Sequence, residues 1–350
     1  MKDPSRILII RRDNIGDLIC TTPIFRALRA RYPDGRIDAL VNSYNGPVLR
    51  NNPDINQYFS YTKAKHREPG ESALGVYLRR IGLLVDLRRQ GYDTVILAND
   101  GDTARALKFA RWLAPARVIA FVKPGRNATG IDIPVPPVEQ PEHAVEIAYR
   151  LLAPIGIAGT PPALRLSPDR VERERARQAW RDDPILDGAA GRLLAIHVSA
   201  RKVPQRWPAK RFIELMQRLH RQVDARFMLF WSPGDEDNPL HPGDDRKAGE
   251  ILAATRDIPV LPYPTARLEQ LIGGLSVCDA MVCSDGGAMH IGAGLGLPIV
   301  CFFGNSDASR WHPWGVPYEL LQEPSGDVND ISVDAALDAY HRLAARTGAA

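Results

Sequence analysis

Cysteine is scarce in this chain, and long apolar runs are absent from it. Of the 350 residues four are cysteines, Cys20, Cys278, Cys283 and Cys301, and none forms a Cys-x-x-Cys pair. We therefore expect reduced core residues of a cytoplasmic protein rather than a disulfide framework. No stretch approaches the roughly 20 apolar residues that a membrane span needs. The first apolar run, residues 7–10, is too short for a secretory signal, so any membrane contact is expected to be peripheral.

The chain also lacks the signatures of two large classes of protein. No Gly-x-Gly-x-x-Gly fingerprint follows the first apolar run, which removes the main support for a dinucleotide-dependent dehydrogenase. No stripe of basic residues is interleaved with aromatic ones, so we expect no nucleic-acid partner. The formal net charge of +4 is mildly basic and suits an anionic small molecule or a glycolipid.

Short apolar runs alternate with amphipathic segments along the chain. The runs predict strands buried on both faces, and the amphipathic segments predict helices between them. The alternation predicts parallel, doubly wound sheets. The expected strands are residues 6–10, 37–41, 94–97, 118–121, 193–198, 227–231, a short one near Val260, 280–284 and 299–303. The expected helices are residues 19–32, 76–90, 171–181, 209–219, 244–255, 268–278, 289–295 and 333–346.

A proline-rich stretch, residues 159–191, interrupts this alternation and marks a domain boundary. We predict an α/β protein of two Rossmann-like domains, residues 1–165 and 185–330, whose parallel sheets face a central cleft. Residues 331–350 are expected to form a C-terminal helix, with the N-terminal domain as a candidate packing surface. Ligands of open α/β sheets bind beyond the carboxyl ends of the strands. The loops that follow strands are therefore the candidate functional segments.

The first such loop, residues 11–18, reads Arg-Arg-Asp-Asn-Ile-Gly-Asp-Leu. Gly16 allows the backbone to approach a ligand closely. Asp17 stands at the start of a predicted helix, where its carboxylate can take a proton from an attacking hydroxyl. The alternative is a purely structural Asp17, because the helix dipole stabilises a negative charge at that position without any catalysis. Spacing alone leaves both interpretations open.

The second loop, residues 197–208, reads His-Val-Ser-Ala-Arg-Lys-Val-Pro-Gln-Arg-Trp-Pro. Ser199 brings a hydroxyl donor, and Arg201, Lys202 and Arg206 bring three cations. A helix start beside several cations suits a diphosphate. The alternative is a solvated basic surface loop, the commoner fate of such charges.

The third loop follows the strand 280–284 and reads Asp-Gly-Gly-Ala-Met-His. The paired glycines Gly286 and Gly287 expose backbone N–H groups to an anion. Asp285 can accept from a hydroxyl or orient the loop, and His290 lies one helical turn beyond Gly286. The alternative for His290 is a buried histidine bonded to a backbone carbonyl. For the later glycines, 292, 294 and 296, we favour close packing of a helix on the sheet.

Metal binding has weak support in the sequence. Asp-x-Asp spellings occur at residues 100–102 and 235–237, but a pair of this kind is nonspecific. The cations of the second loop offer another way to neutralise a diphosphate. We therefore predict no metal requirement and no cofactor.

Taken together, these segments resemble glycosyltransferase family 9, the ADP-heptose:lipopolysaccharide heptosyltransferases. The stretch 7–18 followed by Thr-Thr-Pro23 is similar to the start of that family. Arg206-Trp-Pro208 with Arg211-Phe212 is similar to its middle block. Ser284 to His290, Leu297-Pro298 and Phe303-Gly304 are similar to its closing block. The resemblance spans residues 5 to 320 and both domains.

The resemblance implies a GT-B fold, with the acceptor on the N-terminal domain and an ADP-sugar donor on the C-terminal one. It implies an inverting, metal-independent transfer of L-glycero-D-manno-heptose from ADP-heptose to a lipopolysaccharide core or related acceptor. Such an acceptor is a lipid-linked anionic oligosaccharide, reached from the cytoplasmic face of the inner membrane. Two alternatives stay open: a GT-B transferase that uses another nucleotide-sugar, and a non-catalytic sugar-binding protein of two domains.

The resemblance also implies roles for individual residues. Asp17 is the general base, and the acceptor side of the cleft is lined by Arg12, Asn14 and Gly16. The donor-binding residues are Ser199, Lys202, Arg206, Asp285, Gly286, Gly287 and His290. Basic residues of the N-terminal domain are either acceptor contacts or a solvated face: Lys63, Lys65, Arg67, Arg79, Arg80 and Arg105.

One departure from the family pattern concerns the phosphate site. The family often has a lysine where this chain has Gln205, and Lys202 or Arg201 is the candidate substitute. The acidic residue expected near the ribose is Glu236 or Asp245.

Overall fold

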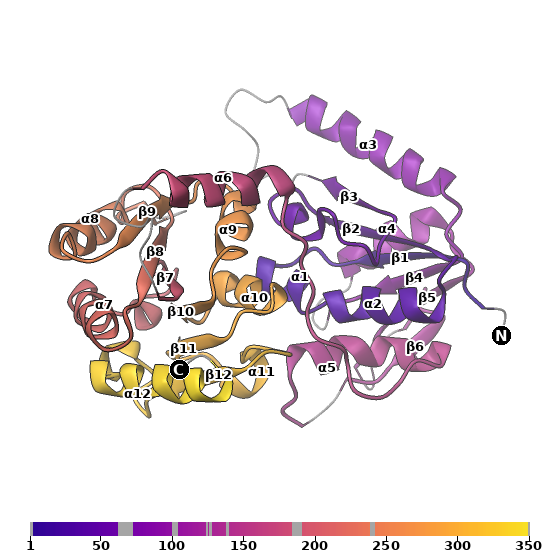
Figure 1. Ribbon diagram of the computed structural model, residues 1–350. Helices are drawn as coiled ribbons and strands as arrows, with labels where there is room; N and C mark the ends of the chain where they lie inside the picture. Colours follow the sequence, from indigo (N-terminus) through magenta and orange to yellow (C-terminus); the bar gives the residue numbers. More distant parts are fainter. Residues whose placement is uncertain are drawn as a thin grey trace. The chain divides into compact units, whose positions relative to one another are not determined.

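The structure, a computed structural model, describes most of the chain. The described residues are 3–61, 73–99, 104–123, 125, 128–137, 140–183, 191–238 and 242–348. The chain forms two compact units, Met1–Leu164 and Arg165–Ala350. Each unit has its own six-stranded sheet (Figure 1).

All strand pairs of the N-terminal sheet are parallel. In spatial order its strands are β3 (Gln57–Tyr61), β2 (Arg36–Asn42), β1 (Arg6–Ile10), β4 (Thr94–Leu97), β5 (Arg117–Phe121) and β6 (Ile133–Val135). The chain order reverses direction between β1 and β4, and loops diverge at such a point to leave room for a ligand. Ile10 is level with Leu40 and Leu97. The segments after β1, β2 and β4 therefore emerge side by side.

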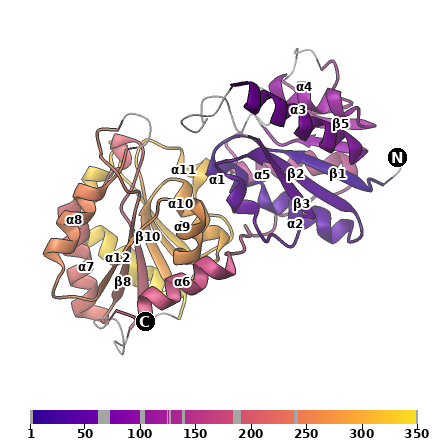
Figure 2. The ribbon, with the colours of Figure 1, turned by 90° about the horizontal axis from the view of Figure 1, so that it is seen from above.

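Helices cover both faces of the N-terminal sheet (Figures 1 and 2). They are α1 (Ile15–Ile19), α2 (Thr22–Arg31), α3 (Ala73–Arg89), α4 (Ala104–Leu113) and α5 (Ala144–Tyr149), with short 3-10 turns η1 (Gly46–Leu49) and η3 (Arg150–Ile155). The helices α3 and α4 pack together on one face, where Leu87 and Phe109 join Leu8, Ile10 and strand neighbours in a buried cluster. The helices α2 and α5 contact each other on the opposite face.

The segment after β1 differs from the single helix expected from residue 19 onward. The structure has two helices, α1 and α2, separated by Cys20 and Thr21. Pro23 explains the break. In a continuous helix its ring would clash with the carbonyl of Ile19, whereas proline is well tolerated in the first turn of a new helix.

The C-terminal sheet repeats the topology of the first. Its parallel strands, in spatial order, are β12 (Tyr318–Gln322), β11 (Ile299–Phe303), β10 (Ala280–Ser284), β7 (Leu193–His197), β8 (Arg226–Trp231) and β9 (Val260–Pro264). Cys283 of β10 is level with His197 of β7. The loops that follow these two central strands therefore begin next to each other.

Helices also cover both faces of the C-terminal sheet. They are α6 (Arg170–Arg181), α7 (Ala209–Val223), α8 (Asp245–Ala254), α9 (Leu268–Leu275), α10 (Gly287–Gly294), α11 (Ala308–Trp311) and α12 (Val333–Arg346), with 3-10 turns η4 (Val203–Gln205) and η5 (Val328–Asp330). One face carries α7, α8 and α12, and the other carries α9 and α10, with α6 against α9.

The C-terminal helix α12 packs on the C-terminal unit. It contacts α7, β11 and β12, and its apolar stripe, including Leu337, Tyr340 and Leu343, is buried in the core cluster of that unit. On sequence grounds, the candidate packing surface for this helix was the N-terminal domain. The structure instead places the helix on the C-terminal unit. Its amphipathic spacing predicted the helix, but such spacing does not specify which apolar surface the stripe covers.

Candidate functional site

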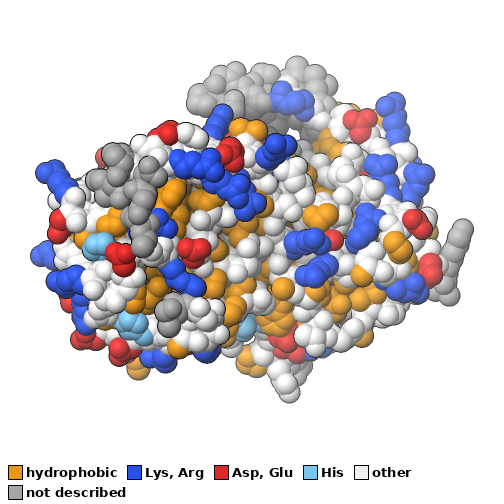
Figure 3. Space-filling model, in the orientation of Figure 1, with side chains coloured by type: hydrophobic (Ala, Val, Ile, Leu, Met, Phe, Trp, Pro, Cys, Tyr) orange, Lys and Arg blue, Asp and Glu red, His pale blue; other side chains and the backbone are white. Residues whose placement is uncertain are grey.

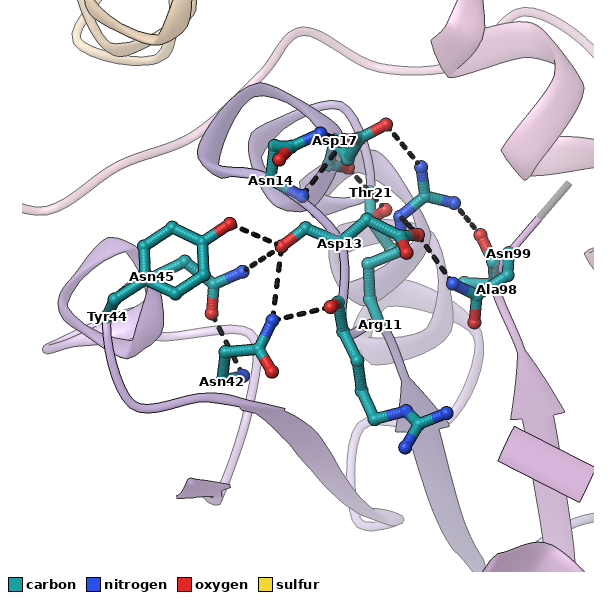
Figure 4. A network of polar contacts seen from close by, with 11 residues as sticks. Arg11, Asp13, Asn14, Asp17, Thr21, Asn42, Tyr44, Asn45, Ala98 and Asn99 are labelled. Carbon is teal, nitrogen blue, oxygen red and sulfur yellow. Dashed lines mark hydrogen bonds and ion pairs between the residues drawn. The ribbon is translucent and has the colours of Figure 1, made fainter. Parts of the chain in front are cut away.

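The N-terminal candidate site lies in the segment that joins β1 to α1 (Figure 4). Asp17 is in the first turn of the short helix α1, and its side chain is 16% exposed. Its Oδ1 accepts from Arg11 Nη2 at 2.9 Å. Its Oδ2 accepts from the backbone N–H and the side-chain amide of Asn14, both at 3.0 Å. The carboxylate is thus held in one orientation by a cation and two N–H donors.

Arg11 is the centre of this polar network. Its side chain is almost completely buried, and it bridges two carboxylates, because its Nε also lies 3.2 Å from Asp13 Oδ2. Its Nη1 donates to the carbonyl of Ala98, just beyond β4. Asn99 donates to the same oxygen of Asp13 at 2.5 Å. Residues from the ends of β1 and β4 therefore fix the two carboxylates together.

The end of β2 fixes the backbone of the same loop. Asn42 Nδ2 donates to the carbonyl of Arg12 at 2.5 Å and to that of Asp13 at 3.2 Å. The carbonyl of Asp13 also accepts from Tyr44 Oη at 2.7 Å and Asn45 Nδ2 at 3.1 Å (Figure 4). Sequence reasoning missed these amides because they are distant from the loop along the chain.

Arg12 packs differently from its neighbour Arg11. Its guanidinium lies 5.6 Å from the ring centre of Tyr61 and 5.0 Å from that of Phe109, which are cation–π distances. Gly16 lies within α1, and Asn14 precedes that helix. Of the three residues expected on the acceptor side, Asn14 donates two hydrogen bonds to Asp17, from its backbone N–H and its side-chain amide.

The C-terminal candidate site begins where β7 ends. Ser199 Oγ accepts from the backbone N–H of Ser232, beyond β8, at 2.9 Å. Arg206 is half-buried, and its Nε donates to the carbonyl of Ala200 at 3.0 Å. Lys202 and Arg201 are exposed. The following Trp207 is fully buried against Phe302, and its Nε1 donates to the carbonyl of Ile331 at 3.0 Å. This tryptophan anchors the basic loop to the core.

Asp285 is joined to this loop by Gln205. Gln205 is buried, and its amide donates to Asp285 Oδ2 at 2.7 Å and to Ser306 Oγ at 2.8 Å. The backbone N–H of Asp285 donates to the carbonyl of Phe302 at 2.9 Å. Loops that follow β7, β10 and β11 therefore meet at this amide. On sequence grounds, Gln205 stood out only as the position where the family often has a lysine.

The glycines after Asp285 start a helix, as expected. Gly286 precedes α10 and Gly287 is its first residue, and a Cβ at Gly286 would meet no atom within 4 Å. His290 is 3% exposed, and its ring meets Trp311 edge-on at 6.0 Å. Gly292 fits the packing explanation, because a Cβ there would lie 2.7 Å from Met281 Sδ.

Lys247 is a functional candidate that sequence reasoning missed. It lies in the first turn of α8, and its Nζ donates to the carbonyl of Val198 at 2.9 Å. Burial lowers the pKa of Lys247 to about 8, although Asp244 opposes the shift. Burial and, less strongly, the ammonium of Lys247 lower the pKa of His197 to about 4. A single lysine in a charged helical segment carries no signal in the sequence that would distinguish it.

The acidic residues considered for a metal or a ribose have protein partners. Asp235 Oδ1 accepts from the backbone of Asp237 in an exposed turn, and Glu236 pairs with Arg246. Asp245 accepts from Trp231 Nε1 at 2.7 Å and from the Gly234 N–H at 2.9 Å. In the part of the chain that the structure describes, no three His, Cys, Asp or Glu side chains are grouped as metal ligands. The Asp-x-Asp pair at 100–102 lies outside the described residues. Metal independence stays a prediction.

The surface charges and the helix lengths bear on partners. Lys and Arg side chains are interspersed with Asp, Glu and hydrophobic side chains on the face drawn in Figure 3. Among the basic residues considered for the acceptor, Arg79 is exposed on α3. The residues Lys63, Lys65 and Arg67 and the side chains of Arg80 and Arg105 lie outside what the structure describes.

Every helix in the described part of the chain is too short or too polar to cross a lipid bilayer. All four cysteines are buried and free.

Solved structures of other proteins share the fold of this chain. The chain has a TM-score of 0.77 with a family 9 glycosyltransferase of Veillonella parvula, at 18% identity and 98% coverage of each chain. It has a TM-score of 0.74 with Escherichia coli ADP-heptose lipopolysaccharide heptosyltransferase II, at 18% identity, covering 98% of this chain and 99% of that one. A third likeness, with a TM-score of 0.73, 17% identity and coverage of 97% and 99%, is to an E. coli heptosyltransferase solved with ADP. The fold is therefore an α/β fold of the GT-B type, as predicted.

The sequence comparisons then give the family. The model of glycosyltransferase family 9 (heptosyltransferase) matches residues 80–340, so the chain belongs to that family. It is similar to lipopolysaccharide heptosyltransferase 3 of E. coli K12, at 26% identity over 305 residues that cover 85% of this chain and 82% of the relative. It is also similar to lipopolysaccharide heptosyltransferase 2 of Salmonella typhimurium, at 28% identity over 315 residues, with coverage of 86% and 83%. The resemblance read from the motifs is confirmed.

Proposed function

We propose that this glycosyltransferase moves L-glycero-D-manno-heptose from ADP-heptose to a lipopolysaccharide core or related acceptor, with inversion and without a metal ion. Family membership supports heptosyl transfer, and a relative of the same fold was solved with ADP. The acceptor would be a lipid-linked anionic oligosaccharide at the cytoplasmic face of the inner membrane. The protein would act there as a cytoplasmic enzyme in peripheral contact with that membrane.

The observation that carries this proposal is the way in which Asp17 is held. Arg11 and Asn14 supply three hydrogen bonds to its carboxylate, and the side chain keeps some exposure to solvent. A base that is already oriented needs little rearrangement when the acceptor arrives. Asp17 takes the proton of the acceptor hydroxyl as that oxygen bonds to the anomeric carbon. The bond from this carbon to the phosphate oxygen breaks, and its electron pair leaves with ADP.

The C-terminal unit would hold the donor. Ser199, Lys202 and Arg206 would contact the diphosphate, where cations stabilise the charge that develops on the leaving group. Asp285, Gly286, Gly287 and His290 would line the rest of the donor site. Arg12, Asn14 and Gly16 would lie on the acceptor side near Asp17. Hydroxyl groups of a sugar are suitable partners for Asp285, whose carboxylate is oriented by Gln205.

Replacement of Asp17 tests the base. We expect Asp17→Ala and Asp17→Asn to lower kcat roughly 10²- to 10⁴-fold, the usual contribution of general-base catalysis. The Kd of ADP should change little, because the donor is bound by the C-terminal unit. Steady-state assays with ADP-heptose and calorimetric titration with ADP measure the two quantities.

Asp34→Ala provides the matched control, because Asp34 is an exposed aspartate of the turn after α2. Its kcat should equal that of the wild type. A near-normal kcat in the Asp17 variants would remove Asp17 from the chemistry.

Nucleotide binding tests the donor class and the role of metal. We expect ADP to bind more tightly than UDP in calorimetric titrations, and the affinity to be the same with and without EDTA. A preference for UDP would indicate a GT-B transferase of another nucleotide-sugar. A loss of ADP binding in EDTA would contradict metal independence and return the acidic pairs to consideration as ligands. Binding of a sugar without any turnover would indicate a non-catalytic binding protein.

A further inference from the structure

Lys247 occupies a position that is unfavourable for a lysine. It lies in the first turn of α8, where the helix dipole favours negative charge. Its side chain is half-buried, and its Nζ lies 5.1 Å from the ring centre of the buried Phe212, a cation–π distance that replaces part of the lost interaction with water. Both the dipole and the loss of hydration cost free energy. A bound anion near the ammonium would offset these costs.

The partner of Lys247 connects it to the basic loop. Its Nζ donates to the carbonyl of Val198, and Arg206 Nε donates to the carbonyl of Ala200. The two cations thus bind the residues on either side of Ser199. The Ser199 oxygen accepts from Ser232, and its O–H can donate at the same time. A hydroxyl donor is therefore framed by two positive charges at the end of a central strand.

The charges around Lys247 come from several elements. Asp244, just before α8, and Glu250, within it, attract the ammonium, while Arg206 of the basic loop repels it. His197 of β7 also faces it, with a neutral ring at pH 7. The neighbouring Gln205 is an uncharged amide bound to Asp285 and Ser306. Helix α8 therefore brings to this loop a positive charge that position 205 lacks.

We propose that Lys247 is a positioning residue of an anion site centred on Ser199, where with Arg206 it selects the pyrophosphate of a nucleoside diphosphate. The hydrogen bond from Lys247 to the carbonyl of Val198 fixes the start of the loop and keeps the ammonium charge next to it. This inference rests on the proposed donor role of the C-terminal unit. It assigns a role in anion binding to a residue of α8, which lies outside the three candidate loops.

The test compares ADP, AMP and adenosine in calorimetric titrations of the wild type, Lys247→Met and Lys247→Arg. Methionine keeps the stem on Phe212 and removes the charge. We expect Lys247→Met to bind ADP roughly tenfold more weakly, the effect of losing one nearby partly buried cation, and adenosine as the wild type does. Lys247→Arg should recover most of the ADP affinity. The control is Lys210→Met, which removes an exposed lysine from the first turn of α7 and should bind ADP normally.

The dependence on pH separates a charge effect from a loss of structure. Wild-type ADP affinity should fall as the pH is raised through about 8, where Lys247 loses its proton, and Lys247→Met should show no such step. Equal ADP affinity in wild type and Lys247→Met, or the same pH profile in both, would overturn the role of Lys247 and leave the proposed function intact. If the wild type binds neither ADP nor UDP, the proposed function and this inference both fail.

Discussion

At the scale of single residues, Gln205 shows how a neutral side chain can organise a charged site. Its amide orients Asp285 and Ser306 at once, and it is buried while it does so. Buried polar groups need such partners, because an unsatisfied one costs about 1–3 kcal/mol. Asp285 is therefore held by a hydrogen bond from an amide rather than by an ion pair with position 205.

His197 should make the C-terminal unit sensitive to acid. Its pKa is lowered from an ordinary 6.5 to about 4 in the folded chain, chiefly by burial. The unfolded chain then binds the proton more readily between these two values, so the free energy of unfolding falls as the pH drops from 6.5 to 4. We expect a loss of about 3 kcal/mol from this group alone.

Thermal unfolding of His197→Asn across this pH range measures the effect. The fall in Tm between pH 6.5 and 4 should be smaller in this variant than in the wild type. The control is His341→Asn, because His341 lies partly exposed on α12 and bonds Gln222. An unchanged acid dependence in His197→Asn would show that another group is responsible.

At the scale of elements, the end of β11 approaches η4 so closely that only glycine fits. A Cβ on Gly304 would overlap the carbonyl oxygen of Pro204, the residue before Gln205. Because the obstacle is backbone, it cannot move aside as a flexible side chain can. Gly304 thus sets the spacing at which Gln205 reaches Ser306, two residues beyond the glycine.

We expect Gly304→Ala to destabilise the protein by about 2 kcal/mol, as overpacking does, and to weaken ADP binding. Gly249→Ala provides the contrast. Gly249 lies exposed within α8, where a Cβ would meet nothing within 4 Å, so alanine should stabilise the helix by roughly 0.5–1 kcal/mol. Differential scanning calorimetry of the two variants measures both changes in stability, which should have opposite signs. Equal stability of Gly304→Ala and the wild type would show that the loop accommodates the extra methyl group without a loss of stability.

The strands that the sequence predicted and the strands that it missed differ in their position in the sheet. The central strands β1, β4, β7, β10 and β11 are continuous apolar runs, because both of their faces are covered. The strands β3, β6 and β12 were missed. They lie at the edges of the sheets and are only partly buried. Strands β3 and β12 mix polar with apolar residues, and β6 is only Ile-Pro-Val, so their composition carries little strand signal.

At the scale of the whole molecule, the two units repeat one topology. Solved structures of a family 9 glycosyltransferase and of a heptosyltransferase share the fold over almost their full length. This explains why the fold class could be predicted. Alternating apolar runs and amphipathic segments predict parallel sheets with few alternatives. Each candidate loop follows a central strand, so its place at the carboxyl edge of a sheet followed from the same pattern.

The sequence by itself determined the sheet class, the central strands and the position of Asp17 just beyond the first strand, because local apolar periodicity decides each of these. Only the tertiary structure decided which side chains hold the candidate groups. Asn42 and Asn99 reach the first loop, Gln205 reaches Asp285, and Lys247 reaches Val198 across long separations in the chain. Such contacts depend on strand order and register, which bring together residues whose spacing along the chain carries no information about their distance.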